Sequence, residues 1–190
     1  MQPPQLTFRV DLPGAQNRLV EMILYISHRC QGARRFGGIK LNKILWKSDF
    51  DAYAARGVPV TGRAYQRLRL GPAPREMLPV HRSMLQNGLI KVEPTDFGDG
   101  IIEQRTVPLR EPDLTNFTPD DISFVDRAIG HFWTLTGMET SDDSHGAAWS
   151  TRANGEPMPY ETALLADRSP QTPQMLRLKQ MIYDREWLSD

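Results

Sequence analysis

Apolar residues recur at helical spacing through most of the chain, and this pattern predicts a mainly helical protein. In residues 15–30 they gather on one face with charged residues elsewhere, so a first amphipathic helix is expected there. A threonine, a proline and two aspartates at 118–121 form a strong start for a later helix. Further helices are expected over residues 39–56, 74–87, 118–137, 140–150 and 160–166, and after Ser169-Pro170 in the last 20 residues.

The helix expected over residues 39–56 is apolar on two sides. Its faces consist of Leu41, Ile44, Leu45, Ser48 and Ala52 and, nearly opposite, Trp46, Phe50 and Tyr53. A helix of this kind is either central in the fold and packed on both sides, or covered on one side by a partner protein. We favour the central helix and keep the partner as the alternative.

Two other stretches predict β structure. Residues 58–70 predict an extended element that ends in a rigid turn at 71–74, because the two prolines of Gly-Pro-Ala-Pro cannot donate to a strand ladder. Residues 89–92 and 101–109 predict a hairpin, since glycines and aspartates fill the turn between them. The expected fold is therefore α+β and mainly helical, with about six helices around the 39–56 helix and a small antiparallel sheet and hairpin.

The net charge of zero conceals a division of the chain into a basic and an acidic half. Residues 1–95 contain 15 Lys and Arg but 6 Asp and Glu, whereas residues 96–190 contain 8 and 17. The simpler interpretation is that the two halves neutralise each other within one folded domain. The alternative is a DNA-binding regulator that contacts phosphates through arginines of the extended segment, namely Arg63, Arg67, Arg69 and Arg75.

Composition and motifs exclude several kinds of chemistry. Cys30 is the single cysteine and continues an apolar stripe, so a buried thiol in a reducing cytoplasm is expected, and neither a membrane span nor a secretory leader is readable. The four histidines are scattered and no glycine-rich phosphate loop occurs, so we expect no metal and no cofactor. Ser144 and His145 follow two aspartates, which we interpret as a helix start rather than a hydrolase site.

The order of four motifs resembles the Panacea domain of SocA-like antitoxins. They are IKLNKILWKSDF at 39–50, TGRAY at 61–65, GPAP at 71–74 and GLI at 88–90. Ser144-His145, Trp149 and Tyr160 are similar to the family's C-terminal region. The chain departs from the usual pattern at Asn42, Trp46 and Ala73, where glutamine, tyrosine and valine are commoner. The resemblance covers roughly residues 15–165.

The resemblance implies an antitoxin that neutralises its toxin by direct protein contact and is not an enzyme. It implies a toxin encoded by an adjacent gene as the partner; at least one relative delivers its toxin to a protease, which makes a protease a second expected partner. We expect an N-terminal arm at 1–14, the Panacea domain at 15–168 and a helical extension at 169–190.

Aromatic and arginine side chains are the usual anchors of protein interfaces. The residues that we predict to bind the toxin are Trp46, Phe50, Tyr53, Tyr65, Arg67, Arg69 and Trp149. The residues of the family motifs, with an expected structural role, are Leu41, Lys43, Leu45, Gly71, Pro72, Pro74, Ser144 and His145.

Overall fold

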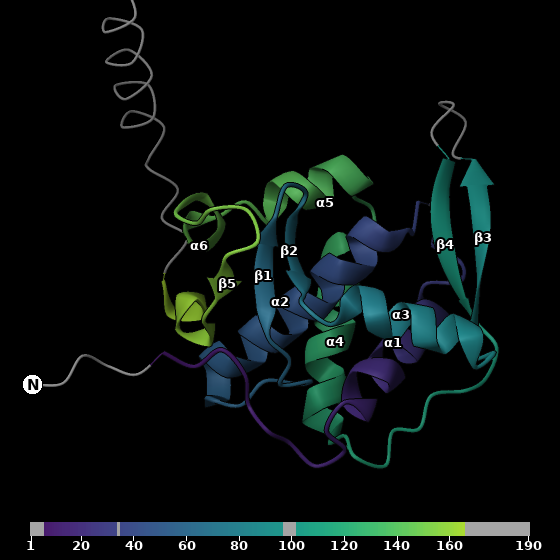
Figure 1. Cartoon of the computed structure of the whole chain (residues 1–190), viewed down its shortest axis with the longest axis horizontal. Helices are drawn as coiled ribbons and strands as arrows, with labels where there is room; N and C mark the ends of the chain where they lie inside the picture. Colours follow the sequence, from purple (N-terminus) through teal and green to yellow (C-terminus); the bar gives the residue numbers. More distant parts are fainter. Residues whose placement is uncertain (1–5, 34, 97–101, 166–190) are drawn as a thin grey trace, which may run out of the picture.

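Six α-helices and two small antiparallel sheets make up the part of the chain that this computed structural model describes, residues 6–33, 35–96 and 102–165 (Figure 1). The helices are α1 (Asn17–Arg29), α2 (Gly38–Arg56), α3 (Met77–Gln86), α4 (Pro119–Phe132), α5 (Gly137–Asp143) and α6 (Ala147–Ser150), followed by a 3₁₀ helix, η1 (Tyr160–Leu164). The strands are β1 (Tyr65–Leu68), β2 (Gly71–Pro74), β3 (Ile90–Asp96), β4 (Ile102–Pro108) and β5 (Pro157–Met158). The predicted α+β, mainly helical fold is confirmed.

Helix α2 is packed on both sides, as favoured from its two apolar faces. One face enters the main core with α1 and α4, where Leu41 and Leu45 are each 1% exposed. The other face packs against β1, β5 and η1 through an aromatic cluster that includes Phe50. Gly57, in the left-handed conformation at φ 72°, ends the helix. The chain itself therefore covers the second face of α2.

The first sheet has the strand order β2-β1-β5, and both pairings are antiparallel. The prediction of a rigid turn at 71–74 is wrong, because these residues form strand β2, with Leu68 opposite Gly71 and Tyr65 opposite Pro74. Prolines are tolerated there because β2 is the edge strand and needs no outward donors. Strand β5, the other neighbour of β1, is two residues long and directly precedes Pro159 and η1.

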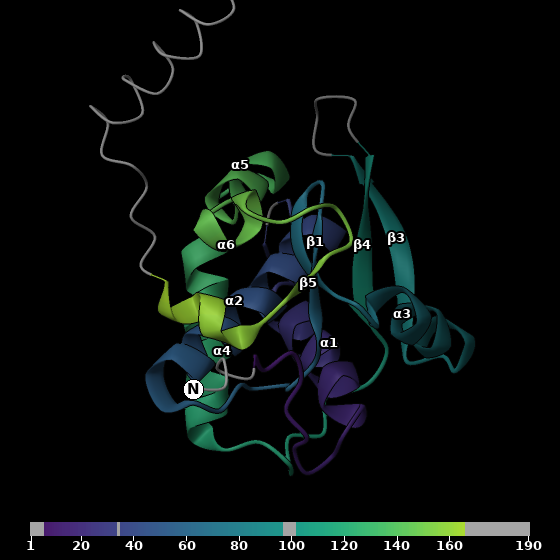
Figure 2. The ribbon, with the colours of Figure 1, turned by 60° about the vertical axis from the view of Figure 1, so that its left-hand side comes forward.

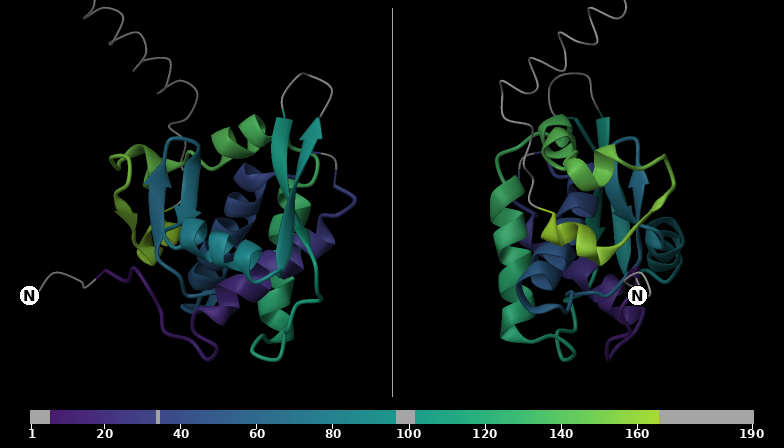
Figure 3. Two further views of the ribbon diagram at one scale, coloured as in Figure 1. Left: turned by 45° about the vertical axis from the view of Figure 1, so that its right-hand side comes forward. Right: turned by 90° about the vertical axis from the view of Figure 1, so that its left-hand side faces the viewer.

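The second sheet is the predicted hairpin of β3 and β4, paired from Ile90 opposite Pro108 to Asp96 opposite Ile102. It stands apart from the first sheet, with α3 near its base (Figures 1 and 3). Arg105 of β4 donates to the carbonyls of Gln31 and Ala33, at 2.7 and 2.6 Å. These bonds fasten the hairpin to the loop after α1.

The helices differ from those expected in four places. Helix α3 begins at Met77 rather than Pro74, because Pro74 belongs to β2. Helix α4 ends at Phe132, and Thr136 starts a new helix by accepting from the Glu139 N–H, so the segment expected as one helix over 140–150 is divided into α5 and α6. The helix expected over 160–166 is the 3₁₀ helix η1. The extension at 169–190 lies outside the described residues.

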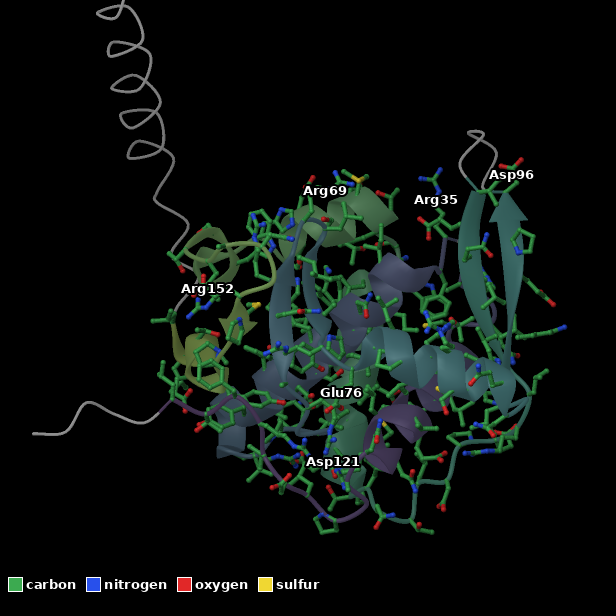
Figure 4. All side chains as sticks on the ribbon, viewed as in Figure 1. Arg35, Arg69, Glu76, Asp96, Asp121 and Arg152 are labelled. Atoms are coloured by element: carbon green, nitrogen blue, oxygen red, sulfur yellow. The ribbon has the colours of Figure 1, made fainter. Side chains whose placement is uncertain are left out.

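The two oppositely charged halves meet in several ion pairs. Arg18 Nη2 lies 3.2 Å from Asp121 Oδ2, and Arg110 Nη2 lies 2.6 Å from Glu21 Oε1. Arg56 pairs with both Asp120 and Asp121. Asp121 is labelled at the end of the molecule away from α5 (Figure 4). The pairs of Arg18 and Arg56 join the basic half to the acidic half, as the predicted neutralisation within the domain requires.

The described part of the N-terminal arm, residues 6–14, lies against the domain. The Val10 N–H donates to the Gly62 carbonyl at 3.0 Å, and the Tyr160 N–H donates to the Thr7 carbonyl at 2.8 Å. The arm therefore joins the loop before β1 to the start of η1.

Among the described residues, no helix has the length and the apolar character that crossing a membrane requires.

Candidate protein-binding site

Lys43 connects α2 to the first sheet. Its side chain is buried, 2% exposed, and its Nζ donates to the Pro72 carbonyl at 2.9 Å. Gly71 has φ 98°, and a Cβ on it would lie 2.5 Å from Lys43 Cε and 2.3 Å from Ser144 Oγ. Position 71 therefore needs glycine both for its backbone conformation and for the approach of these two side chains.

The end of α5 lies over the turn between β1 and β2, at one end of the molecule (Figure 2). Ser141 Oγ donates to the Leu70 carbonyl at 3.0 Å and lies 3.3 Å from His145 Nε2, and Ser144 Oγ donates to the Ser141 carbonyl at 2.7 Å. The expected helix start at Ser144 is wrong: Ser144 is the C-cap of α5, because the helix begins earlier, at Thr136. Ser141 fastens α5 to the turn between β1 and β2, while Ser144 and His145 contact Ser141.

Three residues that the sequence analysis singled out form a stack on the surface. The rings of His145 and Trp149 lie 3.7 Å apart at 14°, and Arg67 Cζ lies 4.0 Å from the Trp149 ring. Trp149 Nε1 donates to the Leu68 carbonyl at 2.8 Å, which fixes the indole beside β1. We call this group of Arg67, His145 and Trp149 the Arg67 stack; all three residues are half-buried.

The electrostatics of the Arg67 stack favour a neutral imidazole. Burial lowers the pKa of His145, the positive charges of Lys43 and Arg67 lower it further, and Asp142 opposes them. Above neutral pH the stack therefore presents a flat aromatic surface with one guanidinium.

A cleft of about 360 Å³ opens beside the stack, between the N-terminal half of α2 and the first sheet. Its lining consists of Ile39, Asn42, Lys43, Leu68, Arg69, Leu70, Gly71, Ala73 and Asn154. We call it the Lys43 cleft. Arg69 is exposed at its rim, beside α5 (Figure 4). The described residues that line this cleft include two cations and neither aspartate nor glutamate, and burial lowers the pKa of Lys43 to about 7.

The predicted aromatic anchors separate into exposed and buried members. Phe50 and Tyr65, 4% and 1% exposed, pack edge to face at 5.4 Å, so the prediction that they touch a toxin does not fit the folded chain, whose own η1 and β5 cover them. Trp46 and Tyr53 are half-buried at the edge of the same cluster, and Tyr53 stacks on Tyr160 at 5.1 Å. Contact of Trp46 and Tyr53 with a toxin stays a prediction.

Sequence reasoning missed the polar centre of this cluster. Asp49 is completely buried and accepts hydrogen bonds from Thr61 and from the Tyr65 hydroxyl, the latter at 2.9 Å. The Tyr160 hydroxyl donates to the Arg63 carbonyl at 2.6 Å. Burial raises the pKa of Asp49 to about 6, although these donors act in the opposite direction. A carboxylate between two apolar helix faces was the available signal for an internal network.

The arginines expected to address DNA phosphates do not form an open row. Arg63 is 1% exposed, and its Nη1 lies 3.4 Å from Glu76 Oε2. Arg67 is engaged in the stack with Trp149, so of the four arginines that we expected to contact phosphates, Arg69 and Arg75 have exposed side chains. The buried Arg63 removes one of the contacts on which the DNA-binding alternative was based.

The remaining motif residues are structural. Leu41 and Leu45 belong to the main core, while Pro72 and Pro74 are buried in β2. Cys30 is buried and free, as expected from its place on an apolar stripe. Within residues 6–33, 35–96 and 102–165, no cluster of three or more His, Cys, Asp or Glu side chains lies where it could hold a metal ion.

This α+β domain combines the Arg67 stack with a cleft that is lined by two cations. The family model described as antitoxin SocA-like, Panacea domain, matches residues 41–150, more than half of the chain, and the chain belongs to this family. The match lies inside the 15–168 domain that the sequence predicts. No curated protein and no solved structure matched the chain.

Proposed function

We propose that this antitoxin-family chain neutralises a toxin by binding it directly, through the Arg67 stack and the adjoining Lys43 cleft. The observation that supports the proposal most strongly is that segments far apart in the sequence meet at this site. Lys43 of α2, Gly71 of β2 and Ser144 at the end of α5 are far apart in sequence and meet at Gly71. Lys43 and Gly71 line the Lys43 cleft. Trp149 and Arg67 form the surface beside it.

The side chains at this surface suit adhesion to a protein rather than bond-making. Tryptophan and arginine are the residue types most often found as interface hot spots, and here each is held in place from behind. The Trp149 indole is bonded to the Leu68 carbonyl, and the Arg67 guanidinium is stacked on the indole. Because both are positioned before a partner arrives, little side-chain entropy is lost on binding. A non-enzymatic role is part of the proposal.

The proposed partner is a toxin encoded by a gene next to that of this chain. Delivery of the toxin to a protease stays a prediction of the family resemblance. The test is co-expression of the neighbouring toxic gene with the wild-type chain, followed by co-purification. Wild type should restore growth and retain the toxin, whereas failure of both would contradict the proposal.

Two substitutions locate the binding surface. Trp149→Ala and Arg67→Ala should each weaken toxin binding by about 2 kcal/mol or more, roughly thirtyfold. Arg127→Ala is the matched control, since Arg127 Cζ lies 4.2 Å from the Phe124 ring in a similar stack on α4. Titration calorimetry with purified toxin gives the affinities. Equal loss in all three variants would place the binding surface elsewhere.

A further inference from the structure

We propose that the Lys43 cleft receives a side-chain carboxylate of the toxin, carried on a segment that continues into the groove between α3 and the β3–β4 hairpin. The inference rests on the proposed function and adds to it the chemistry of the recognised segment. Three observations support it: a buried cation that faces the cleft, an unpartnered amide oxygen beside it, and the continuity of two grooves with different charge.

Lys43 is a buried cation, and no carboxylate within residues 6–33, 35–96 and 102–165 forms an ion pair with it. An ammonium has three protons to donate, and in the described part of the chain Lys43 Nζ donates to one acceptor, the Pro72 carbonyl. The cleft lining includes Arg69 as a second cation and no carboxylate among the residues described. A buried charge of this kind is stabilised by an incoming carboxylate, which would satisfy the remaining donors.

Asn42 supplies a second polar group at the same place. Its Oδ1 is buried and has no hydrogen-bond partner within the described residues. A buried acceptor without a donor costs free energy, and an N–H of a bound backbone would satisfy it. Asn42 precedes Lys43 on α2, and both line the cleft. An acceptor beside a cation matches a peptide that brings an N–H and a carboxylate together.

The cleft continues into a second groove of about 420 Å³, because Ile39 and Asn42 line both. The second groove is bounded by α3 and the hairpin and includes Met77, Leu78 and Val92. Leu78 is 80% exposed and offers an apolar contact at its edge. A segment that passes through both grooves and continues beyond them carries its carboxylate on a side chain, and this is the arrangement that we propose.

The two grooves differ in charge, and this difference determines in which direction the toxin segment runs through them. Glu103 and His81 line the groove at α3, while Lys43 and Arg69 line the cleft. A partner carboxylate is attracted to the cleft and repelled by Glu103. The charge difference therefore favours one orientation of an acidic segment over its reverse.

The titratable groups around Lys43 allow its contribution to be read from a pH series. His145, after α5, lies close enough to Lys43 for the lysine charge to lower its pKa, and Asp142 and Arg67 act on the same imidazole. Arg69 lines the cleft together with Lys43. Because the pKa of His145 is lowered, its imidazole stays neutral above pH 7. Lys43 is then the group among these that loses charge as the pH rises from 7 to 8.5, and a carboxylate binds the protonated form.

The test is calorimetric titration of the full-length chain with the toxin encoded beside it, at pH 6.5 and 8.5. For wild type the dissociation constant should rise about tenfold or more over this range, since the protonated fraction of Lys43 falls. Lys43→Met should bind roughly thirtyfold more weakly at pH 6.5 and show no such pH dependence. Lys47→Met is the matched control on the same helix, because Lys47 pairs with Asp51 at 3.0 Å, and it should behave as wild type.

The toxin side completes the test. Aspartates and glutamates of the toxin are changed singly to asparagine and glutamine, and one of these changes should weaken binding as much as Lys43→Met. Combined with Lys43→Met, that change should cost little more than either alone. If instead the toxin's C-terminal carboxylate were the coupled group, the assignment to a side chain would be overturned.

Other results separate this inference from the proposed function. Wild type that binds toxin equally at both pH values, with Lys43→Met binding as tightly, overturns the inference and leaves the proposed function standing. Wild type that binds no toxin overturns both. If Lys43→Met does not fold, Lys43→Gln and the pH series on wild type carry the test.

Discussion

Arg18 and Lys43 are both buried cations, but their partners differ: Arg18 is paired with a carboxylate, whereas Lys43 donates to a backbone carbonyl. Arg18 is 5% exposed and bonded to Asp121, to the Val60 carbonyl and to the Asn116 carbonyl. Lys43 is 2% exposed and donates to the Pro72 carbonyl. Asp121 and Arg69, labelled in Figure 4, mark the regions of these two cations at opposite ends of the molecule.

The difference indicates what each region is for. A buried cation that has a carboxylate and carbonyls around it holds elements together, and here Arg18 joins α1 to the start of α4. A buried cation that faces a cleft without a carboxylate weakens the free protein and is stabilised when an anion enters. On this comparison, the Arg18 region stabilises the fold and the Lys43 region is organised for a partner.

The largest loss of stability is expected when the ion pair between Arg18 and Asp121 is removed. Arg18→Met leaves the buried Asp121 with one remaining arginine, Arg56, and should lower the free energy of unfolding by about 3 kcal/mol. Urea denaturation followed by circular dichroism measures it. Asp120→Asn removes an exposed partner of Arg56 and should cost no more than about 1 kcal/mol. Similar losses in both variants would contradict a structural role for the Arg18 pair.

Gly71→Ala should give the next largest loss, about 2–4 kcal/mol. The added methyl adopts an unfavourable φ and collides with Ser144 Oγ and Lys43 Cε. Gly155→Ala is the matched control: its φ is 82°, but its Cβ would meet nothing within 4 Å, so about 1 kcal/mol is expected. Thermal unfolding of the two variants compares them. Equal losses in the two variants would mean that the close packing of Gly71 against Lys43 and Ser144 does not contribute to stability.

The smallest expected effect is a gain of stability on replacing Lys43. It is the most informative for the comparison of Lys43 with Arg18, because replacing Arg18 should have the opposite sign. Lys43→Met should raise the free energy of unfolding by about 1–3 kcal/mol at pH 6.5, because it removes a buried unpaired charge. The pKa of Lys43 is about 7 when folded, below its value of 10.5 in the unfolded chain, so between these values the unfolded state binds the extra proton. Wild-type stability from this group therefore rises with pH, and the advantage of the variant should shrink from pH 7 to 10. A loss of stability at every pH would assign Lys43 a structural role.

Periodicity was sufficient for the helical framework. Apolar spacing predicts α1, α2 and the hairpin close to their observed bounds, and the two apolar faces of α2 correctly indicate a central helix. The interpretation of 71–74 was wrong because local rules for proline cannot tell a turn from an edge strand; that choice depends on β1 pairing beside it. Strand β5 is two residues long and carries no periodic signal at all.

The candidate site was only partly predictable. Trp149, Arg67 and His145 were singled out from residue type and motif, but their stacking depends on where α5 and α6 lie against β1. Phe50 and Tyr65 were misassigned because an aromatic face has the same sequence pattern whether the chain's own η1 or another protein covers it. The burial of Asp49 and Lys43 depends on the tertiary fold, and no local sequence pattern reports it.

Hydrogen exchange of the purified chain, alone and with its toxin, tests most directly whether the end of the molecule that carries Arg67, Trp149 and Lys43 is where the partner sits. We expect amides in residues 66–73 and 141–152 to exchange more slowly in the complex, and those of α4 to exchange at the same rate in both samples. Slowing confined to α4, with residues 66–73 and 141–152 unaffected, would contradict this assignment.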